Sequence, residues 1–558
     1  MGRPSGPAAF ALFWTAAAGL FLCNAAMTAQ KEAKDPAAAK AEVVRLTGFG
    51  DVCHPVSTRN PAAQEFFDQG LRLIYAFNHD EAVRAFKQAA RLDPALAMAH
   101  WGIALALGPN INAPVDAAQE KAAYDAVQKA LKLAGEAPEH ERAYIEALAL
   151  RYSDDPKADL KKLAVAYKEA MGRLAQRYPD DLDAATLYAE SGMDLRPWQL
   201  WSRDGKPAEG TEELVAVLES VLRRNPHHTG ANHYYIHAVE ASLHPERALP
   251  SAARLGMLAP AAGHLVHMPS HIYMRVGDYA EAARCNAVAV AADEAYFEKA
   301  RCSEGIYPMM YYSHNLHFLA VAHAIQGRSA EAKAAADKLA AHAGKHVEDM
   351  PMLEGFLPTP LLISARLHRW DEILKVPAPP AEQKLVTASW HFARGLAFAA
   401  TRRLEDAERE RKALLALKKA VPKKAMYSPL NTAQSVFDVA LGVLDARLAA
   451  ARGDGQTAVA SFRAAVQAED ALAYAEPPDW YLPVREMLGG LLLGTGDAAA
   501  AERIFREELT RNPRSGRALF GLSACLKAQG KTYAAQSVEA EFKAAWKNAD
   551  FALLTEDL

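Results

Sequence analysis

The sequence predicts an all-α fold, an array of antiparallel helical hairpins, and three observations support this. Good helix formers such as alanine, leucine, glutamate, lysine and arginine dominate the 558 residues. Runs of alternating β-branched residues, which are typical of strands, are nearly absent. Small residues and prolines recur at the spacing that two closely packed antiparallel helices require. Such an array can grow beyond one ordinary core, because each hairpin packs only on its neighbours.

The N-terminus has the order of residues of a secretory signal. One early charge, Arg3, precedes an apolar run at 8–22 and small residues at 25–29. We expect residues 1–29 to be a cleaved signal peptide and the protein to be periplasmic or secreted. Bulky residues before Cys23 disfavour lipid attachment there, and an uncleaved membrane anchor is the less favoured alternative. The mature chain has no other stretch of about twenty apolar residues, so we expect no membrane span in it.

The charge balance and the cysteines exclude two further classes of protein. With 63 Lys+Arg against 67 Asp+Glu, the chain shows no basic excess, so we expect no nucleic-acid partner. Four cysteines follow the signal, at positions 53, 285, 302 and 525, too few and too scattered for a disulfide framework. Cys285 and Cys302 are open to two interpretations, a disulfide or two small buried thiols.

The hairpins can be located along the chain from their small residues and prolines. Residues 30–60 are expected to form a linker and an entry segment, and the ordered body to begin near Pro61. The first clear hairpin, 64–94, has its marker residues at Gly70, Ala82, Phe86, Ala89 and Pro94. A second hairpin, 482–513, has Gly489, Ala501, Phe505 and Pro513 at the same spacing, and a third begins at Ser515. Weaker units between them read MRVGDYAEAARCN, AIQGRSAEAKAAA and TRRLEDAERERKA.

This hairpin pattern resembles the tetratricopeptide repeat. The chain as a whole resembles secreted bacterial tetratricopeptide-repeat proteins that carry FNHDEA, HWGIAL, GHLVHMPSH and PPDWYLPVRE. The resemblance implies a helical-hairpin solenoid and export, and it implies a concave groove that binds a peptide or protein partner. A break near MPMLEGFLPTP predicts two consecutive arrays, an N-terminal one at 61–350 that contains the histidine-rich region and a C-terminal one at 351–558.

Two long segments interrupt the regular pattern in the N-terminal array. They are LGPNINAPVD at 107–116 and MDLRPWQLWSRDGKPAEG at 193–210. Both carry proline, glycine and asparagine or tryptophan where a plain array would have a short turn. Long loops on one rim of an array often line its binding site, so we expect these two to do so.

The histidines are concentrated between His227 and His323. This stretch holds 11 of the 19 histidines in 97 residues, whereas an even distribution would place about three there. Several recur three or four residues apart, which places their imidazoles on one face of a helix. Imidazole is the commonest ligand of borderline metals and also titrates nearest neutral pH, so the pattern indicates a metal site or an acid–base site.

The motif HYYIHAVE offers the best-defined candidate ligands. His233 and His237 lie one turn apart, and Glu240 follows three residues after His237, so two nitrogens and a carboxylate can meet at one point. The competing interpretation is that these residues lie at the edge of the core, beside apolar neighbours.

Two further motifs extend the candidate set. GHLVHMPSH supplies His264, His267 and His271, but its proline should kink or end the helix and separate His271 from the other two. HNLH supplies His314 and His317. The methionines beside these motifs would suit copper, although methionine among aromatic residues more often serves packing.

Two functional hypotheses follow from these motifs. In the first, the histidines and Glu240 bind a transition metal, copper, zinc or iron, in a site that could serve an oxidoreductase or a hydrolase. In the second, the protein is an exported scaffold that binds partners in its groove, and the histidines are structural. Motifs such as HExxH, GxSxG, GxxxxGK[ST] and CxxCH do not occur, so no particular reaction is predicted. We expect Trp480 and Tyr481, in EPPDWYLPVRE, to have a packing role.

Overall fold

The structure, a computed structural model, describes residues 43–302 and 304–558, so the expected signal peptide lies outside the described residues. These residues form helices, and the only β interactions among them are three isolated bridges. The first helix of the body, α3 (Pro61–Tyr75), begins at the residue where we expected the ordered body to start. The all-α fold is therefore confirmed.

The chain packs into two compact units, which we describe separately. Within the described residues, unit 1 comprises 43–269 and 291–308, and unit 2 comprises 270–290 and 309–558. The expected array boundary between residues 350 and 351 falls inside unit 2, and the division into two repeat arrays stays a prediction. One helix, α15 (Tyr279–Ala300), contributes residues to both units.

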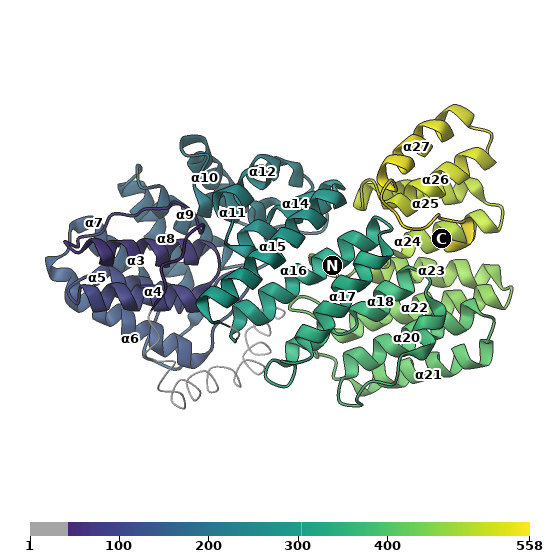
Figure 1. Ribbon diagram of the computed structural model, residues 1–558, viewed down its shortest axis with the longest axis horizontal. Coiled ribbons are helices and arrows are strands. Elements are labelled where there is room, and N and C mark those ends of the chain that lie inside the picture. The colour runs from purple at the N-terminus through teal and green to yellow at the C-terminus, as the bar shows by residue number, and fades with distance from the viewer. Residues whose placement is uncertain (1–42, 303) are drawn as a thin grey trace, which may run out of the picture. The chain divides into compact units, whose positions relative to one another are not determined.

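Unit 1 is a succession of helical hairpins that follows an extended entry segment, residues 43–60 (Figure 1). After α3 its helices are α4 (His79–Leu92), α5 (Ala97–Ala106), α6 (Ala117–Leu133), η2 (Ala134–Glu136), α7 (Glu139–Ala149), α8 (Leu160–Arg177), α9 (Leu182–Met193), α10 (Thr211–Arg224), α11 (Thr229–Val239), η3 (Pro245–Ala248), α12 (Leu249–Leu258) and α13 (Gly263–His267).

Unit 2 continues the same architecture (Figure 1). Its helices are α14 (Pro269–Val276), η4 (Tyr307–Tyr311), α16 (Tyr312–Ile325), α17 (Ser329–Ala343), η5 (Pro351–Phe356), α18 (Thr359–Arg366), α19 (Trp370–Lys375), α20 (Lys384–Ala400), α21 (Leu404–Ala420), α22 (Ala433–Ala451), α23 (Gly455–Asp470), α24 (Val484–Gly494), α25 (Ala498–Arg511), α26 (Gly516–Ala528), α27 (Thr532–Ala545) and η6 (Thr555–Asp557). The first residue of α14 and the first two of η4 belong to unit 1.

A phenylalanine packed between two glycines holds successive hairpins together. In unit 1 the buried ring of Phe86, on α4, lies so close to Gly70 and Gly102 that a Cβ on either glycine would come within 2.6 Å of it. In unit 2 the ring of Phe505, on α25, contacts Gly489 and Gly521 in the same way. The repeat predicted from these marker residues is therefore present in both units, and the fold is of tetratricopeptide type.

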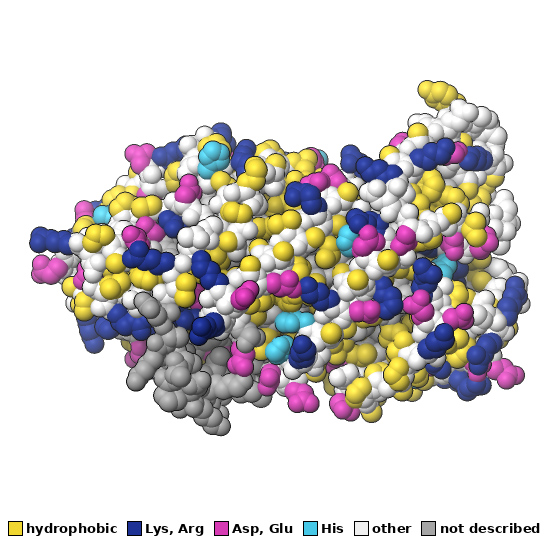
Figure 2. All heavy atoms as spheres, in the orientation of Figure 1, with side chains coloured by type: hydrophobic (Ala, Val, Ile, Leu, Met, Phe, Trp, Pro, Cys, Tyr) yellow, Lys and Arg dark blue, Asp and Glu magenta, His cyan; other side chains and the backbone are white. Residues whose placement is uncertain are grey.

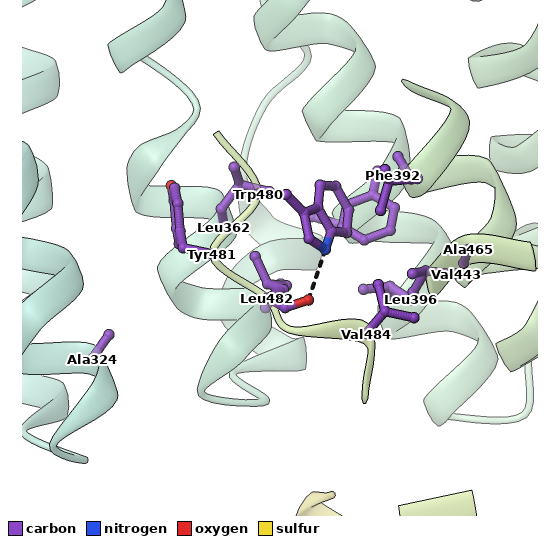
Figure 3. Close-up of a cluster of buried hydrophobic side chains, with 14 of the residues drawn as sticks. Ala324, Leu362, Phe392, Leu396, Val443, Ala465, Trp480, Tyr481, Leu482 and Val484 are labelled. Atoms are coloured by element: carbon purple, nitrogen blue, oxygen red, sulfur yellow. Dashed lines mark hydrogen bonds between the residues drawn. The ribbon is translucent and has the colours of Figure 1, made fainter. Parts of the chain in front are cut away.

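The segment EPPDWYLPVRE has the packing role that we expected. The Trp480 ring lies 5.1 Å from the Phe392 ring, and its Nε1 donates a hydrogen bond of 2.7 Å to the carbonyl of Leu482. Trp480 and Tyr481 are each only 5% exposed. Figure 3 shows these side chains among the aliphatic residues of α20 and α22 that form part of the core of unit 2.

The surface and the cysteines add two observations. Lysine and arginine are interspersed with aspartate and glutamate on the face shown in Figure 2. In the part of the chain that the structure describes, we find no helix with the length and apolar character needed to cross a bilayer. Cys285 and Cys302 are both free thiols, so no disulfide joins them; Cys285 is buried, as the second interpretation expected, whereas Cys302 is only partly buried.

Candidate metal centre

The helix α11 carries the first two candidate ligands, and all eleven of its residues are buried. The His228 side chain caps its N-terminus by accepting a hydrogen bond from the Ala231 backbone N–H. Four residues apart, His233 and His237 project from one face of the helix, and their ring centroids are 4.9 Å apart. Burial of two imidazoles on one helix face requires polar partners for both.

The partner of His233 fixes which of its nitrogens carries the proton. Nδ1 of His233 lies 2.7 Å from the backbone carbonyl oxygen of Tyr75, at the end of α3. A carbonyl oxygen can only accept a hydrogen bond, so Nδ1 carries the proton and Nε2 carries the lone pair. This arrangement is typical of metal-ligating histidines, whose second nitrogen usually donates to a carbonyl or a carboxylate.

His237 is held in the same way by Glu240. Its Nδ1 lies 2.7 Å from Oε1 of Glu240, and both side chains are 1% exposed. A carboxylate oxygen in this position accepts the Nδ1 proton, which places the lone pair of His237 on Nε2. We predicted Glu240 as a direct ligand; in the structure it contacts the outer nitrogen of His237 and orients that imidazole.

The third imidazole, His264, comes from the short helix α13. Nε2 of His264 lies 3.2 Å from Nε2 of His233. Two contacts fix the start of this helix: the His264 backbone N–H donates to the Tyr307 hydroxyl, which in turn donates to Asp293. The adjacent Gly263 allows this close approach, because a Cβ there would lie 2.0 Å from the Asp293 carboxylate.

These three imidazoles have the geometry of a metal-binding set. One nitrogen from each of His233, His237 and His264 lies within 4.8 Å of the other two, and all three residues are buried. A tetrahedral ion with metal–nitrogen bonds of about 2.0–2.1 Å places its ligand nitrogens about 3.3 Å apart, close to the 3.2 Å between His233 and His264. The donor set is neutral nitrogen throughout, which suits zinc, copper or iron.

The ring of Phe77 covers this three-histidine centre. Its centroid lies 4.5 Å from that of His233, 5.8 Å from His237 and 5.4 Å from His264, and the last two rings are stacked on it. Phe77 occupies the turn between α3 and α4 with φ of +54°, a left-handed conformation that costs a non-glycine residue energy. The matching turn positions in unit 2 hold glycine at 277, 327, 453, 496 and 530, and the non-glycine residues His368 and Arg402 at two others. A strained phenylalanine at this position is consistent with a functional role.

The two long loops of unit 1 reach the same region, as we expected. A cavity of about 10 Å³, room for about one water, lies beside His237 and Glu240. Ile111 from the first loop and Trp198 from the second line it, together with Met193, Leu200 and Ala241. The Trp198 ring stands edge-on to His237 at 5.6 Å, and Trp201 anchors the second loop through a hydrogen bond to the carbonyl of Ala238.

The other predicted ligands have different positions. The chain breaks at Pro269 into α13 and α14, as predicted. His267 belongs to unit 1 and His271 to unit 2. The His267 ring lies 5.9 Å from that of His264. In unit 2, His271 and His314 have ring centroids 5.7 Å apart.

His317 lies between aromatic rings. Its centroid is 5.6 Å from that of Phe356 and 5.5 Å from that of Tyr481, all within unit 2. Burial lowers the pKa of this histidine to about 4, so the side chain is neutral at physiological pH. We therefore assign His317 a packing role.

Sequence reasoning missed Tyr75 and Phe77. Tyr75 acts through its backbone carbonyl, which no side-chain pattern reveals. Phe77 lies in the motif FNHDEA. The feature that could have drawn attention to it is a bulky residue at a hairpin turn, where glycine is usual.

Comparison with known proteins identifies no family. No family model matches the chain, and no curated protein matches it. Among solved structures, a human IFIT1 dimer with m7Gppp-AAAA is 12% identical with a TM-score of 0.34, covering 88% of this chain and 91% of that chain. Yeast Tom70 is 12% identical with a TM-score of 0.28, covering 90% and 94%, and the P58(IPK) TPR domain is 10% identical with a TM-score of 0.22, covering 84% and 99%. These values are too low to support a functional inference, so the fold assignment rests on the hairpin packing.

Proposed function

We propose that this protein is a metalloprotein that binds one transition-metal ion, zinc, copper or iron, through His233, His237 and His264. The observation that carries the proposal is the Nε2–Nε2 distance of 3.2 Å between two buried imidazoles, one of which has its other nitrogen hydrogen-bonded to a carbonyl. The third imidazole is oriented in the same manner by a carboxylate. Plain core packing does not require three convergent imidazoles with this pattern of protonation.

A set of three protein ligands leaves a coordination position for a water or substrate, which is typical of catalytic rather than structural sites. A bound ion would supply Lewis-acid or redox chemistry, according to the metal. The chain's own contribution is to orient the imidazoles through Tyr75 and Glu240 and to exclude water with Phe77 and Trp198.

The test is the metal content of the untagged protein after growth with zinc, copper and iron supplied. We expect about one equivalent from this site, and His237→Ala should lose most of it because the set falls to two nitrogens. His100→Ala is the matched control, because His100 is also buried in unit 1, at 7% exposure against 5% for His237. Equal metal in the two variants, or none in the wild type, would contradict the proposal.

Export is a further part of the proposal. The order of charge, apolar run and small residues in 1–29 supports it. Cell fractionation followed by N-terminal sequencing should find the protein outside the cytoplasm with its first residue near position 30. Recovery of the intact N-terminus from the cytoplasm would oppose it.

A second candidate function, a scaffold for a peptide or protein partner, is favoured by one feature of unit 2. Residues 546–558 already lie across its helices: Arg447 donates to the carbonyl of Leu558 at 3.0 Å, and Asp550 accepts from Ser329 at 2.7 Å. Unit 2 therefore already holds a short segment of turns and one 3-10 turn, η6, across its helices.

The test of the scaffold is fluorescence anisotropy with a labelled peptide of residues 546–558. Binding to a chain that ends at residue 545, which leaves the position of the tail open, would support a peptide-binding role if Arg447→Ala weakens it. No binding to either protein would leave the metal centre as the supported function.

A further inference from the structure

A second cluster of metal-ligating side chains lies in unit 1, away from the motifs that the sequence pointed to. It consists of His54, Asp181 and Asp183, whose donor atoms all lie within 4.8 Å of one another. His54 comes from the entry segment, and the two aspartates come from the start of α9. The side chains of His54 and Asp183 are 9% and 13% exposed, so this cluster is largely enclosed.

Hydrogen bonds hold both carboxylates from outside the cluster. The Tyr144 hydroxyl donates to Oδ2 of Asp181 at 2.7 Å, and the Tyr75 hydroxyl donates to Oδ1 of Asp183 at 2.5 Å. The Ala184 backbone N–H donates to the remaining oxygen of Asp181. Carboxylate ligands of metal ions are commonly oriented by outer hydrogen bonds of this kind.

His228 belongs to this outer layer and is not itself a ligand. Its Nδ1 accepts a hydrogen bond from the Ala231 backbone, so the neutral ring carries its proton on Nε2. That nitrogen faces Oδ1 of Asp183 at 3.2 Å and donates to it. Two donors therefore occupy one oxygen of Asp183, and its other oxygen, Oδ2, is directed at His54.

The contact between His54 and Asp183 has the spacing of two neighbouring ligands. Nδ1 of His54 lies 2.9 Å from Oδ2 of Asp183. Adjacent ligands of an octahedral ion with bonds of about 2.1 Å lie about 3.0 Å apart. When no ion is bound, the Nδ1 proton of His54 bridges the two atoms. An ion would take the place of that proton, which would be released to solvent.

The charge of the cluster favours a divalent cation over a proton. Two carboxylates, a neutral His228 and a doubly protonated, cationic His54 leave a net charge of −1 in an enclosed space. A divalent ion with neutral His54 brings the sum to zero. Among the described residues, no lysine or arginine pairs with Asp181 or Asp183, so without an ion only His54 and the surrounding hydrogen-bond donors stabilise the two carboxylates.

We propose that His54, Asp181 and Asp183 form a second metal site, separate from the three-histidine centre. Two carboxylates and one imidazole suit a harder divalent ion of the Mn²⁺ or Fe²⁺ class, with water in the remaining positions. Tyr75 joins the two sites, because its hydroxyl contacts Asp183 while its carbonyl holds His233. The second site also fixes the entry segment to α9.

The test uses the full chain carrying His237→Ala, so that the three-histidine centre does not contribute, with Mn²⁺ alone as the probe. We expect one equivalent of Mn²⁺, bound with an electron spin-echo signal from one directly coordinated imidazole nitrogen. Adding Asp183→Asn should weaken binding more than about 100-fold, beyond the 10–100-fold typical of outer-layer changes. Adding His54→Gln should abolish the nitrogen signal.

The matched control is Glu141→Gln. Glu141 also holds the entry segment, through hydrogen bonds from Ser57 of 2.6 and 2.7 Å, but supplies no donor to the cluster. It should retain Mn²⁺ binding, and circular dichroism should show all variants folded. Absence of Mn²⁺ binding, a bound ion without the nitrogen signal, or equal affinity in the Asp183 variant would overturn the proposal and leave a His54–Asp183 ion pair. None of these outcomes bears on the three-histidine centre.

Discussion

Replacing Phe77 separates the cost of its backbone strain from the value of its ring. We compare Phe77→Ala with Phe77→Gly. Both remove a buried aromatic ring, a loss of about 3–5 kcal/mol of unfolding free energy. They differ in the backbone, because alanine keeps the left-handed strain at φ of +54° and glycine does not.

The difference between the two variants can be estimated from the turn itself. The left-handed conformation costs a non-glycine residue about 1–2 kcal/mol. Glycine loses about 0.5–1 kcal/mol through its greater freedom in the unfolded chain. We therefore expect Phe77→Gly to be about 1 kcal/mol more stable than Phe77→Ala, the reverse of the usual order of these residues within a helix.

Urea unfolding of the metal-free proteins measures this difference directly. The same pair tests the covering role of the ring, because either variant exposes one side of the three imidazoles to water. Transfer of bound metal to a chelator should be faster in both variants than in the wild type. Equal stability of the two, or greater stability of the alanine variant, would refute the strain argument, and unchanged transfer rates would refute the covering role.

Three further predictions concern single residues. Glu240→Gln should weaken metal binding about 10–100-fold, measured by competition with a chelator, because the outer partner of an imidazole ligand loses its charge. Burial gives His317 a pKa of about 4 in the folded protein, so below pH 6.5 this histidine binds a proton more readily in the unfolded chain. The free energy of unfolding should therefore fall between pH 6.5 and 4, by at most about 3 kcal/mol. In urea unfolding, His317→Phe should reduce this fall without changing the metal content. Gly489→Ala should lower the unfolding free energy by about 1–3 kcal/mol, since its Cβ would lie 2.6 Å from a phenylalanine ring, whereas Gly494→Ala, with open space around it, should not.

The fold could be predicted because its signals are local and repeated. Glycine, alanine and phenylalanine at fixed spacing in 64–94 and 482–513 report a packing that each hairpin makes with its neighbour. Pro269 likewise acts on its own helix, so the break between α13 and α14 followed from the sequence.

The candidate site was predictable only in part. The i,i+4 spacing of His233 and His237 follows from one helix, and their convergence is seen in the structure. The joining of His264 depends on how α13 is placed against α11, which no local pattern specifies. For Glu240 the spacing was right, but whether a carboxylate contacts the metal or the outer nitrogen of a histidine depends on side-chain rotamers.

The second cluster gave no usable signal in sequence. His54 lies 129 positions from Asp183, and an aspartate near a helix start is ordinarily a capping residue. Asp181 does serve as the N-cap of α9. Only the folded chain brings the entry segment beside it.

X-ray absorption spectroscopy of the metal-loaded wild-type protein tests the central claim most directly. At the zinc or copper edge, to which the second site with its preference for Mn²⁺ or Fe²⁺ does not contribute, we predict three imidazole nitrogens at about 2.0–2.1 Å, with the outer-shell scattering that distinguishes imidazole from other nitrogen ligands. Any ion that His237→Ala retains should have one imidazole fewer, and the spectrum of His100→Ala should match the wild type. A first shell with fewer than three imidazoles in the wild type, or one that His237→Ala leaves unchanged, would contradict the three-histidine centre.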